Sequence, residues 1–133
     1  MSCREGVAMK METFKEFSFE AAHKIPPHSD VHGHSFRVAV VVGGEADDNF
    51  GWAVSLYELE EKTESVRLAL DHKYLNAIDG LSVPSLENLA RWIWDRLAPD
   101  VPGLQQIRVE RGVPGYAEGC SYRGEARRAY ADA

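Results

Sequence analysis

The chain has 133 residues and a formal net charge of −6 at pH 7, from 15 Lys and Arg against 21 Asp and Glu. This length fits one domain with a substantial core, and 44% hydrophobic with 27% charged residues excludes a disordered chain. The acidic balance argues against a nucleic-acid partner or an anionic membrane surface. No apolar run approaches the roughly 20 residues of a membrane span. We expect no signal peptide, and two cysteines are too few for a disulfide framework, which favours the cytoplasm.

Hydrophobic patterning predicts four strands and two helices. Alternating phenylalanines and β-branched runs indicate the strands, whereas apolar residues spaced three and four apart indicate the helices. The predicted strands cover residues 11–22, 35–42, 105–109 and 119–123. The predicted helices cover residues 55–70 and 85–97, the second with Ser85 as its N-cap. A Pro-rich loop is expected at 24–31 and a connector at 71–84.

The order of these elements is strand, strand, helix, helix, strand, strand. Two long strands before two consecutive helices predict an α+β domain, with an antiparallel sheet and both helices on one face. We place this single domain at residues 11–125. Residues 1–10 are expected to form a flexible N-terminus, and residues 126–133 a polar tail.

Four of the five histidines lie in one short window, at His23, His28, His32 and His34. In extended backbone, His32 and His34 project from the same face of a strand. His23 ends the preceding predicted strand, so antiparallel pairing would bring it beside them. Three imidazoles with a fourth position open are typical of catalytic zinc. The alternative is that these are ordinary surface histidines, because a His-x-His pair alone is a weak signal. A cupin-type site is excluded, since no carboxylate follows on the same strand.

Four further residues are candidates for a functional role. Asp71 and His72 follow the first predicted helix, either as an oriented carboxylate–imidazole pair for proton transfer or as an ordinary C-terminal turn. Glu110 ends a predicted strand, either as a ligand contact or as a solvated side chain. Cys120 lacks any local feature that would lower its pKa, which favours a small buried hydrophobe over a nucleophile.

Seven segments in order carry a family resemblance. They are FSFEAAHKIP (17–26), HGHSF (32–36), GW (51–52), LDHKYLN (70–76), PSLENLARWIWD (84–95), VERG (109–112) and GCSYRGE (119–125). The chain resembles the 6-pyruvoyl-tetrahydropterin synthase family, and most closely its bacterial branch, the 6-carboxy-5,6,7,8-tetrahydropterin synthases of queuosine biosynthesis. The resemblance implies the tunnelling fold (T-fold), a four-stranded antiparallel sheet with two helices on one face. It also implies trimers paired as hexamers, with active sites between subunits.

The resemblance implies roles for individual residues. Zinc would be held by His23, His32 and His34, and would activate the side chain of 7,8-dihydroneopterin triphosphate or a related pterin. Asp71 and His72 match the proton-relay pair of the family. In a separate motif, Glu110 matches the pterin anchor, where a carboxylate accepts two hydrogen bonds from the ring.

The chain also departs from the family pattern. The catalytic cysteine expected before HGH is absent, and His28 or Asp30 are candidate substitutes. Arg111 stands where a threonine normally follows the pterin anchor. Lys24 and Arg123 remain as candidate phosphate contacts. Three functions therefore stay open: a zinc-dependent pterin lyase, a zinc-containing pterin-binding protein with altered or no synthase activity, and a metal-binding oligomer with no pterin role.

Overall fold

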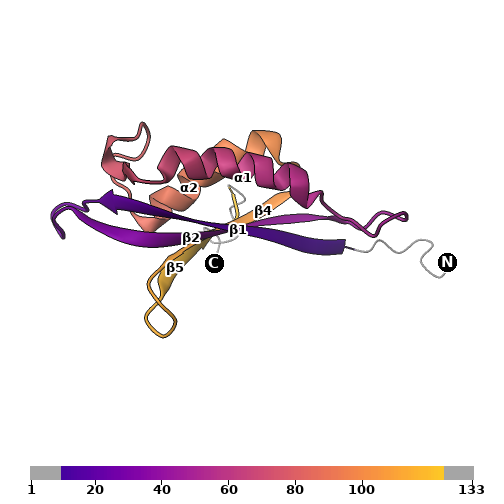
Figure 1. Ribbon diagram of the computed structural model, residues 1–133, viewed down its shortest axis with the longest axis horizontal. Helices are drawn as coiled ribbons and strands as arrows, with labels where there is room; N and C mark the ends of the chain where they lie inside the picture. The colour runs from indigo at the N-terminus through magenta and orange to yellow at the C-terminus, as the bar shows by residue number, and fades with distance from the viewer. Residues whose placement is uncertain (1–9, 125–133) are drawn as a thin grey trace, which may run out of the picture.

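The computed structural model describes residues 10–124 and shows one sheet covered by two helices (Figure 1). The sheet contains five strands in the spatial order β3-β1-β2-β4-β5. The strands are β1 (Lys10–His23), β2 (His32–Glu45), β3 (Lys73–Tyr74), β4 (Leu104–Arg111) and β5 (Glu118–Tyr122). The helices are α1 (Leu56–Leu70) and α2 (Leu86–Leu97), with 3₁₀ turns η2 (Leu75–Ala77) and η3 (Ala98–Asp100).

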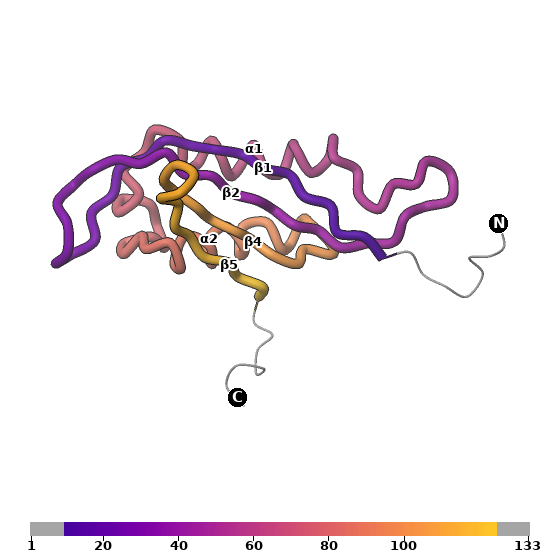
Figure 2. Tube along the Cα trace, turned by 90° about the horizontal axis from the view of Figure 1, so that it is seen from below, coloured from indigo at the N-terminus to yellow at the C-terminus, as the bar shows by residue number. Residues whose placement is uncertain are grey.

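The long β1–β2 hairpin forms the central part of the sheet. The two strands pair antiparallel over their whole length, from Lys10 opposite Glu45 to His23 opposite His32 (Figure 2). Residues alternate between the two sides, so Phe19 and Phe36 face the helices and are 1% exposed, whereas Ser18 and Arg37 lie on the opposite, open face. This alternation determines on which face of the sheet each candidate side chain lies.

Strands β4 and β5 extend the sheet beyond β2. Both pair antiparallel, with Phe36 opposite Arg111 and Arg37 opposite Glu110 across the β2–β4 boundary. The fifth strand, β3, differs from the four-stranded antiparallel expectation, because it adds two residues parallel to Ala21 and Ala22 at the outer edge of β1. A pairing of two residues leaves no hydrophobic pattern in the sequence, which explains why the prediction placed only a connector there.

Both helices lie on one face of the sheet, as Figure 1 shows. Ser55 and Ser85 cap their N-termini, since each side chain accepts a hydrogen bond from a backbone N–H three residues later. The helices bury their apolar faces against the sheet in a single core. Its fully buried members include Phe19, Phe36, Val38, Val40, Leu70, Leu75, Leu81, Leu89, Ile93 and Ile107. Within residues 10–124, neither α-helix has the length and apolar character needed to cross a membrane.

The predicted elements agree with the structure apart from their ends. Both predicted helices are confirmed, and each predicted strand shifts or extends by a few residues. Lys10, assigned to a flexible N-terminus, instead belongs to β1. The predictions for residues 1–9 and for the tail at 126–133 concern parts of the chain outside the described residues.

Candidate metal centre

Three histidines converge where β1 ends and β2 begins. His23 and His32 are direct cross-strand partners, and His34 lies two residues along β2 on the same face. Gly33 between them is in extended strand backbone, which the hypothesis required. The ring centroids are 4.7 Å apart for His23–His32, 5.0 Å for His23–His34 and 4.6 Å for His32–His34. One nitrogen from each ring lies within 4.8 Å of the others, so a single ion could contact all three.

Backbone carbonyls fix the tautomers of two of these rings. His23 Nδ1 lies 3.2 Å from the Pro84 carbonyl oxygen, and His32 Nδ1 lies 2.8 Å from that of Asp30. A carbonyl only accepts, so in each pair the Nδ1–H donates. The two Nε2 atoms, 3.2 Å apart, are then both acceptors when the rings are neutral. A cation bound between them would relieve the repulsion of two facing lone pairs at that distance.

The third ring has an unused nitrogen. His34 Nε2 is buried and, within residues 10–124, has no hydrogen-bond partner. Burial, followed by the positive charge of Arg111, lowers the pKa of His34 to about 4, and burial also lowers the pKa of His23. Both rings are therefore neutral near pH 7, which is the form that binds metal.

The donor set fits a divalent transition metal. Ligands about 2.0–2.1 Å from tetrahedral zinc are about 3.3 Å apart, close to the 3.2 Å between the Nε2 atoms of His23 and His32. Metal-bound imidazoles commonly donate their other N–H to a backbone carbonyl, as these two do. The three residues offer no thiolate and leave a fourth position for a ligand, an arrangement typical of catalytic rather than structural sites.

Asp71 and His72 form an oriented pair. Asp71 Oδ1 accepts from the Glu20 N–H at 2.9 Å, and Asp71 Oδ2 lies 2.9 Å from His72 Nδ1 and 3.2 Å from an Arg67 Nη1. The Glu20 N–H, followed by His72, lowers the pKa of Asp71 and keeps it ionised. His72 adopts φ 60°, unusual for a residue other than glycine, and its N–H donates to the Glu20 carbonyl at 2.6 Å. Such backbone conformations concentrate at functional sites.

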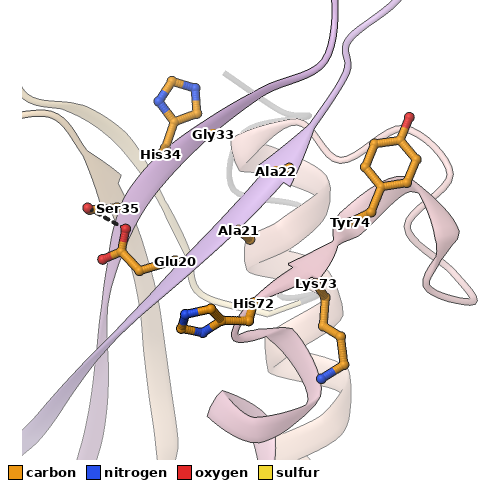
Figure 3. Close-up of a pocket in the computed structure, with 9 residues that line it drawn as sticks. All are labelled: Glu20, Ala21, Ala22, Gly33, His34, Ser35, His72, Lys73 and Tyr74. Carbon is orange, nitrogen blue, oxygen red and sulfur yellow. Dashed lines mark hydrogen bonds between the residues drawn. The ribbon is translucent and has the colours of Figure 1, made fainter.

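One cavity of about 560 Å³ is lined by both His34 and His72. Figure 3 shows these two imidazoles on either side of the β1–β2 pair, with Glu20, Ser35 and Tyr74 completing the wall. The Ser35 hydroxyl donates to Glu20 Oε1 at 2.7 Å. The side chain of His72 is 78% exposed, so its Nε2 can exchange protons with a bound molecule. A metal-ligand candidate and a candidate for proton transfer therefore line the same cavity.

Glu110 lies on the opposite side of the sheet from the histidines. It is the register partner of Arg37 and lies on the open face of the sheet. The neighbouring Val109 is buried and faces the helices, as strand alternation requires. Its carboxylate accepts from Arg108 Nε at 2.6 Å and from Arg37 at 3.2 Å, and these two guanidiniums, Arg108 first, lower its pKa. Within one chain, the sheet separates Glu110 from the metal candidate.

The remaining predicted residues contribute no side-chain ligand to the centre. His28 is exposed in the β1–β2 loop, and no hydrogen bond, ion pair or ring contact joins its side chain to another residue between 10 and 124. Lys24 is exposed beside His23, with its backbone held by both ends of the Asn76 amide. Asp30 contributes its carbonyl to His32. Arg123 is exposed just beyond the end of β5.

Cys120 is a packing residue in this structure. Its thiol donates to the Leu86 carbonyl at 3.3 Å, and burial raises its pKa. A raised pKa leaves little thiolate at neutral pH, so Cys120 is poorly suited as a nucleophile. Cys120 is only partly buried, not fully buried as predicted, but it packs against the core as a small hydrophobe.

Sequence reasoning missed the groups that support the histidines. The carbonyls of Pro84 and Asp30 orient two rings, and the amide of Asn76 ties the end of β1 to the segment after β3. Backbone acceptors leave no trace in residue type. Arg111, whose charge reaches His34, could have been found, since the alternation of β4 places it on the same face as the buried Val109.

Comparison with known proteins agrees with this geometry. The sequence profile described as 6-pyruvoyl tetrahydropterin synthase matches residues 12–125. The chain is 39% identical over 106 residues to the 6-carboxy-5,6,7,8-tetrahydropterin synthase of Synechocystis sp., covering 72% of this chain and 82% of that protein. It is 37% identical over 102 residues to the dihydroneopterin monophosphate aldolase of Pyrococcus furiosus, covering 75% and 86%.

Solved structures confirm the expected tunnelling fold. The 6-pyruvoyl tetrahydropterin synthase of Caenorhabditis elegans superposes with a TM-score of 0.77 at 23% identity, over 89% of this chain and 99% of that one. The profile match over most of the sequence and the two relatives above lead to one assignment: this chain belongs to the 6-pyruvoyl tetrahydropterin synthase family.

Proposed function

We propose that the chain is a zinc-dependent lyase acting on the side chain of a reduced pterin, 7,8-dihydroneopterin triphosphate or a close relative. The observation that carries the proposal is the convergence of three histidine nitrogens within 4.8 Å, on rings whose tautomers turn two lone pairs toward each other. Zinc bound there would polarise side-chain oxygens and make the neighbouring C–H more acidic. The names of the two relatives support a dihydropterin substrate.

In this proposal, Asp71 and His72 move the proton. Asp71 orients the His72 imidazole through Nδ1 and stabilises its protonated form, leaving Nε2 to take or give a proton. In this proposal the substrate side chain occupies the cavity that His34 and His72 both line. The exposed His28 is the candidate second base in the loop that lacks the cysteine.

Substrate binding is proposed for three further residues. Glu110 would accept hydrogen bonds from the pterin ring, a role supported by its lowered pKa, which keeps the carboxylate charged. Lys24 and Arg123 are exposed cations that form no ion pair with another residue in 10–124, and would contact the phosphates.

We further propose a homo-oligomer, a pair of trimers. Residues 10–19 of β1 have no strand partner on their outer edge within the described chain, because β3 pairs only with Ala21 and Ala22, and Asp71 and His72 bond only to Glu20. The outer edge of β5 is open in the same way. Unpaired edges readily take up another strand. A second copy could also bring a Glu110 to the metal that its own sheet keeps away. A cytoplasmic enzyme built on the single domain 11–125 is consistent with this arrangement.

A second candidate is a pterin-binding protein without turnover. It is favoured by the loop between β1 and β2, which contains no cysteine, and by the inert packing of Cys120. Without a general base, the rate would fall by about 10²- to 10⁴-fold.

One experiment separates the candidates. Purified protein is assayed for zinc per chain, then incubated with 7,8-dihydroneopterin triphosphate or monophosphate, and products are identified by mass spectrometry. The lyase predicts about one zinc per chain and a new pterin product, whereas the binding protein predicts tight association and unchanged substrate. The variant His32→Ala should lose zinc and product together, while His28→Ala should keep zinc. Zinc-free wild-type protein, or zinc retained by His32→Ala, would refute the proposed centre.

A further inference from the structure

Arg111 lies beside the proposed metal centre. It ends β4 and is the register partner of Phe36, whose ring centroid is 5.5 Å from that of His34 and 5.8 Å from that of His23. Cross-strand partners project from the same face of a sheet, so Arg111 lies on the helix-covered side with the histidines. Its positive charge contributes to the lowered pKa of both His23 and His34, which agrees with this placement.

The guanidinium of Arg111 is only partly used. Its Nε donates to Glu118 Oε2 at 2.8 Å, and the side chain is 23% exposed. No other hydrogen bond or ion pair within residues 10–124 reaches it, so both Nη groups, with four N–H donors, remain free. Arg67 makes the contrast clear, because its Nε and both Nη groups all bond to Glu64 or Asp71.

The β4–β5 hairpin holds Arg111 in place. Glu118 is its direct cross-strand partner, and Gly112 follows immediately at φ 91°. A Cβ at Gly112 would lie 2.7 Å from the Tyr116 carbonyl oxygen, so the turn is closely packed. Glu118 binds the Nε edge of the guanidinium, which leaves the Nη groups for another partner. Holding the fork in this way reduces the entropy lost when a ligand binds.

We propose that Arg111 binds an anionic oxygen, of a carboxylate or a phosphate, on the ligand held at the metal centre, with Glu118 as its positioning residue. The proposal rests on the proposed function for the identity of the ligand. Three neutral imidazoles leave the charge of a divalent cation uncompensated, and the Arg111–Glu118 ion pair adds no net negative charge to offset it. A ligand with an anionic group is therefore favoured, and the planar fork matches carboxylate and phosphate oxygens.

The test compares binding of matched ligand pairs to the zinc-loaded protein by calorimetry. One pair is 7,8-dihydroneopterin monophosphate against 7,8-dihydroneopterin, and the other is 6-carboxypterin against pterin. Wild-type protein should prefer the anionic member of at least one pair by about 10- to 100-fold. The pair that shows this preference identifies the anion as phosphate or carboxylate. Arg111→Gln should abolish the preference while leaving the Kd of the neutral member and the zinc content unchanged.

Two variants serve as controls. Arg108→Gln removes a guanidinium of the same strand on the open face, so it should keep the preference. Arg111→Lys keeps the charge but loses the fork, and should weaken the anionic ligand severalfold even if Arg111→Gln does not fold. The proposal is overturned by an unchanged preference in both Arg111 variants, or by wild-type protein that ignores the anionic group.

Inorganic phosphate and acetate test Arg111 without any pterin. Titrated into the zinc-loaded protein, at least one should bind, and Arg111→Gln should weaken that binding by about 10-fold or more. If no pterin binds but this loss is seen, the proposed function fails and the anion site stands. If pterins bind but neither small anion depends on Arg111, the anion site fails alone.

Discussion

Replacing His34 with leucine should have opposite effects on protein stability in the absence and in the presence of zinc. Without zinc, the leucine removes a buried nitrogen that has no partner, a group whose burial costs about 1–3 kcal/mol. The Phe36 and His23 rings on either side can pack against an aliphatic chain of similar size. The metal-free variant should therefore be as stable as the metal-free wild type, or more stable.

With zinc, the order should reverse. At a free zinc concentration 100 times the Kd, binding stabilises the wild type by about 2.7 kcal/mol. For a domain of this size, that raises the Tm by about 10 °C. Loss of a residue that only hydrogen-bonds to a metal ligand can weaken metal binding roughly 100-fold. Loss of one of the three ligands themselves should weaken zinc binding by at least as much. At the same zinc concentration, the gain for His34→Leu then falls to about 0.4 kcal/mol, or 1–2 °C.

The assay is thermal unfolding of chelator-treated protein, with and without added zinc, followed by circular dichroism. His28→Leu serves as the control, because the side chain of His28 is exposed and no hydrogen bond or ion pair joins it to another residue between 10 and 124. It should keep the full zinc-dependent rise. A His34→Leu protein that still gains about 10 °C with zinc would refute the assignment of His34 as a ligand.

Other predictions concern titration, proton transfer, the thiol and the core. The folded-state pKa of His34, about 4, lies below the usual 6.5, so metal-free protein should have its full stability above pH 6.5 and lose part of it as the pH falls toward 4, measured by denaturant unfolding. Asp71→Asn should lower the lyase rate about 10²- to 10⁴-fold with zinc content unchanged, measured by metal analysis and turnover. Cys120→Ala should keep activity, and the wild-type thiol should react slowly with iodoacetamide near pH 7, since its pKa is raised. Ile93→Ala should lower the free energy of unfolding by about 2–5 kcal/mol, because Ile93 is fully buried.

The convergence of the three histidines could be predicted from the sequence because it depends on strand geometry. A His-x-His pair in extended backbone shares one face, and a loop of eight residues between the strands returns the chain so that His23 lies opposite His32. Residue type and spacing therefore suffice to bring the three rings together. The orientation of the rings depends instead on the Pro84 and Asp30 carbonyls, which any residue at those positions would supply.

For Glu110, the family motif indicates a role in binding, whereas strand alternation indicates the face of the sheet on which the side chain lies. The family motif implied that Glu110 is a carboxylate that binds the pterin ring. The alternation of β4, with Ile107 and Val109 buried, places Glu110 on the open face and Arg111 on the covered one. Applying the period of two along the segment IRVER would have predicted this arrangement before any coordinates.

Residues on the two faces of the sheet are expected to contact different parts of the ligand. Within one chain, Arg111 and Glu118 lie on the face of the histidines, whereas Glu110 is held by Arg108 and Arg37 across the sheet. A ligand at the metal can therefore meet Arg111 of its own chain, while contact with Glu110 calls for a second copy. If Glu110 binds the pterin ring, oligomerisation is a condition for ring recognition, and the metal and Arg111 can act on the side chain without it. In that case, we expect the affinity for the pterin ring to depend on protein concentration, and the affinity for the metal to be independent of it.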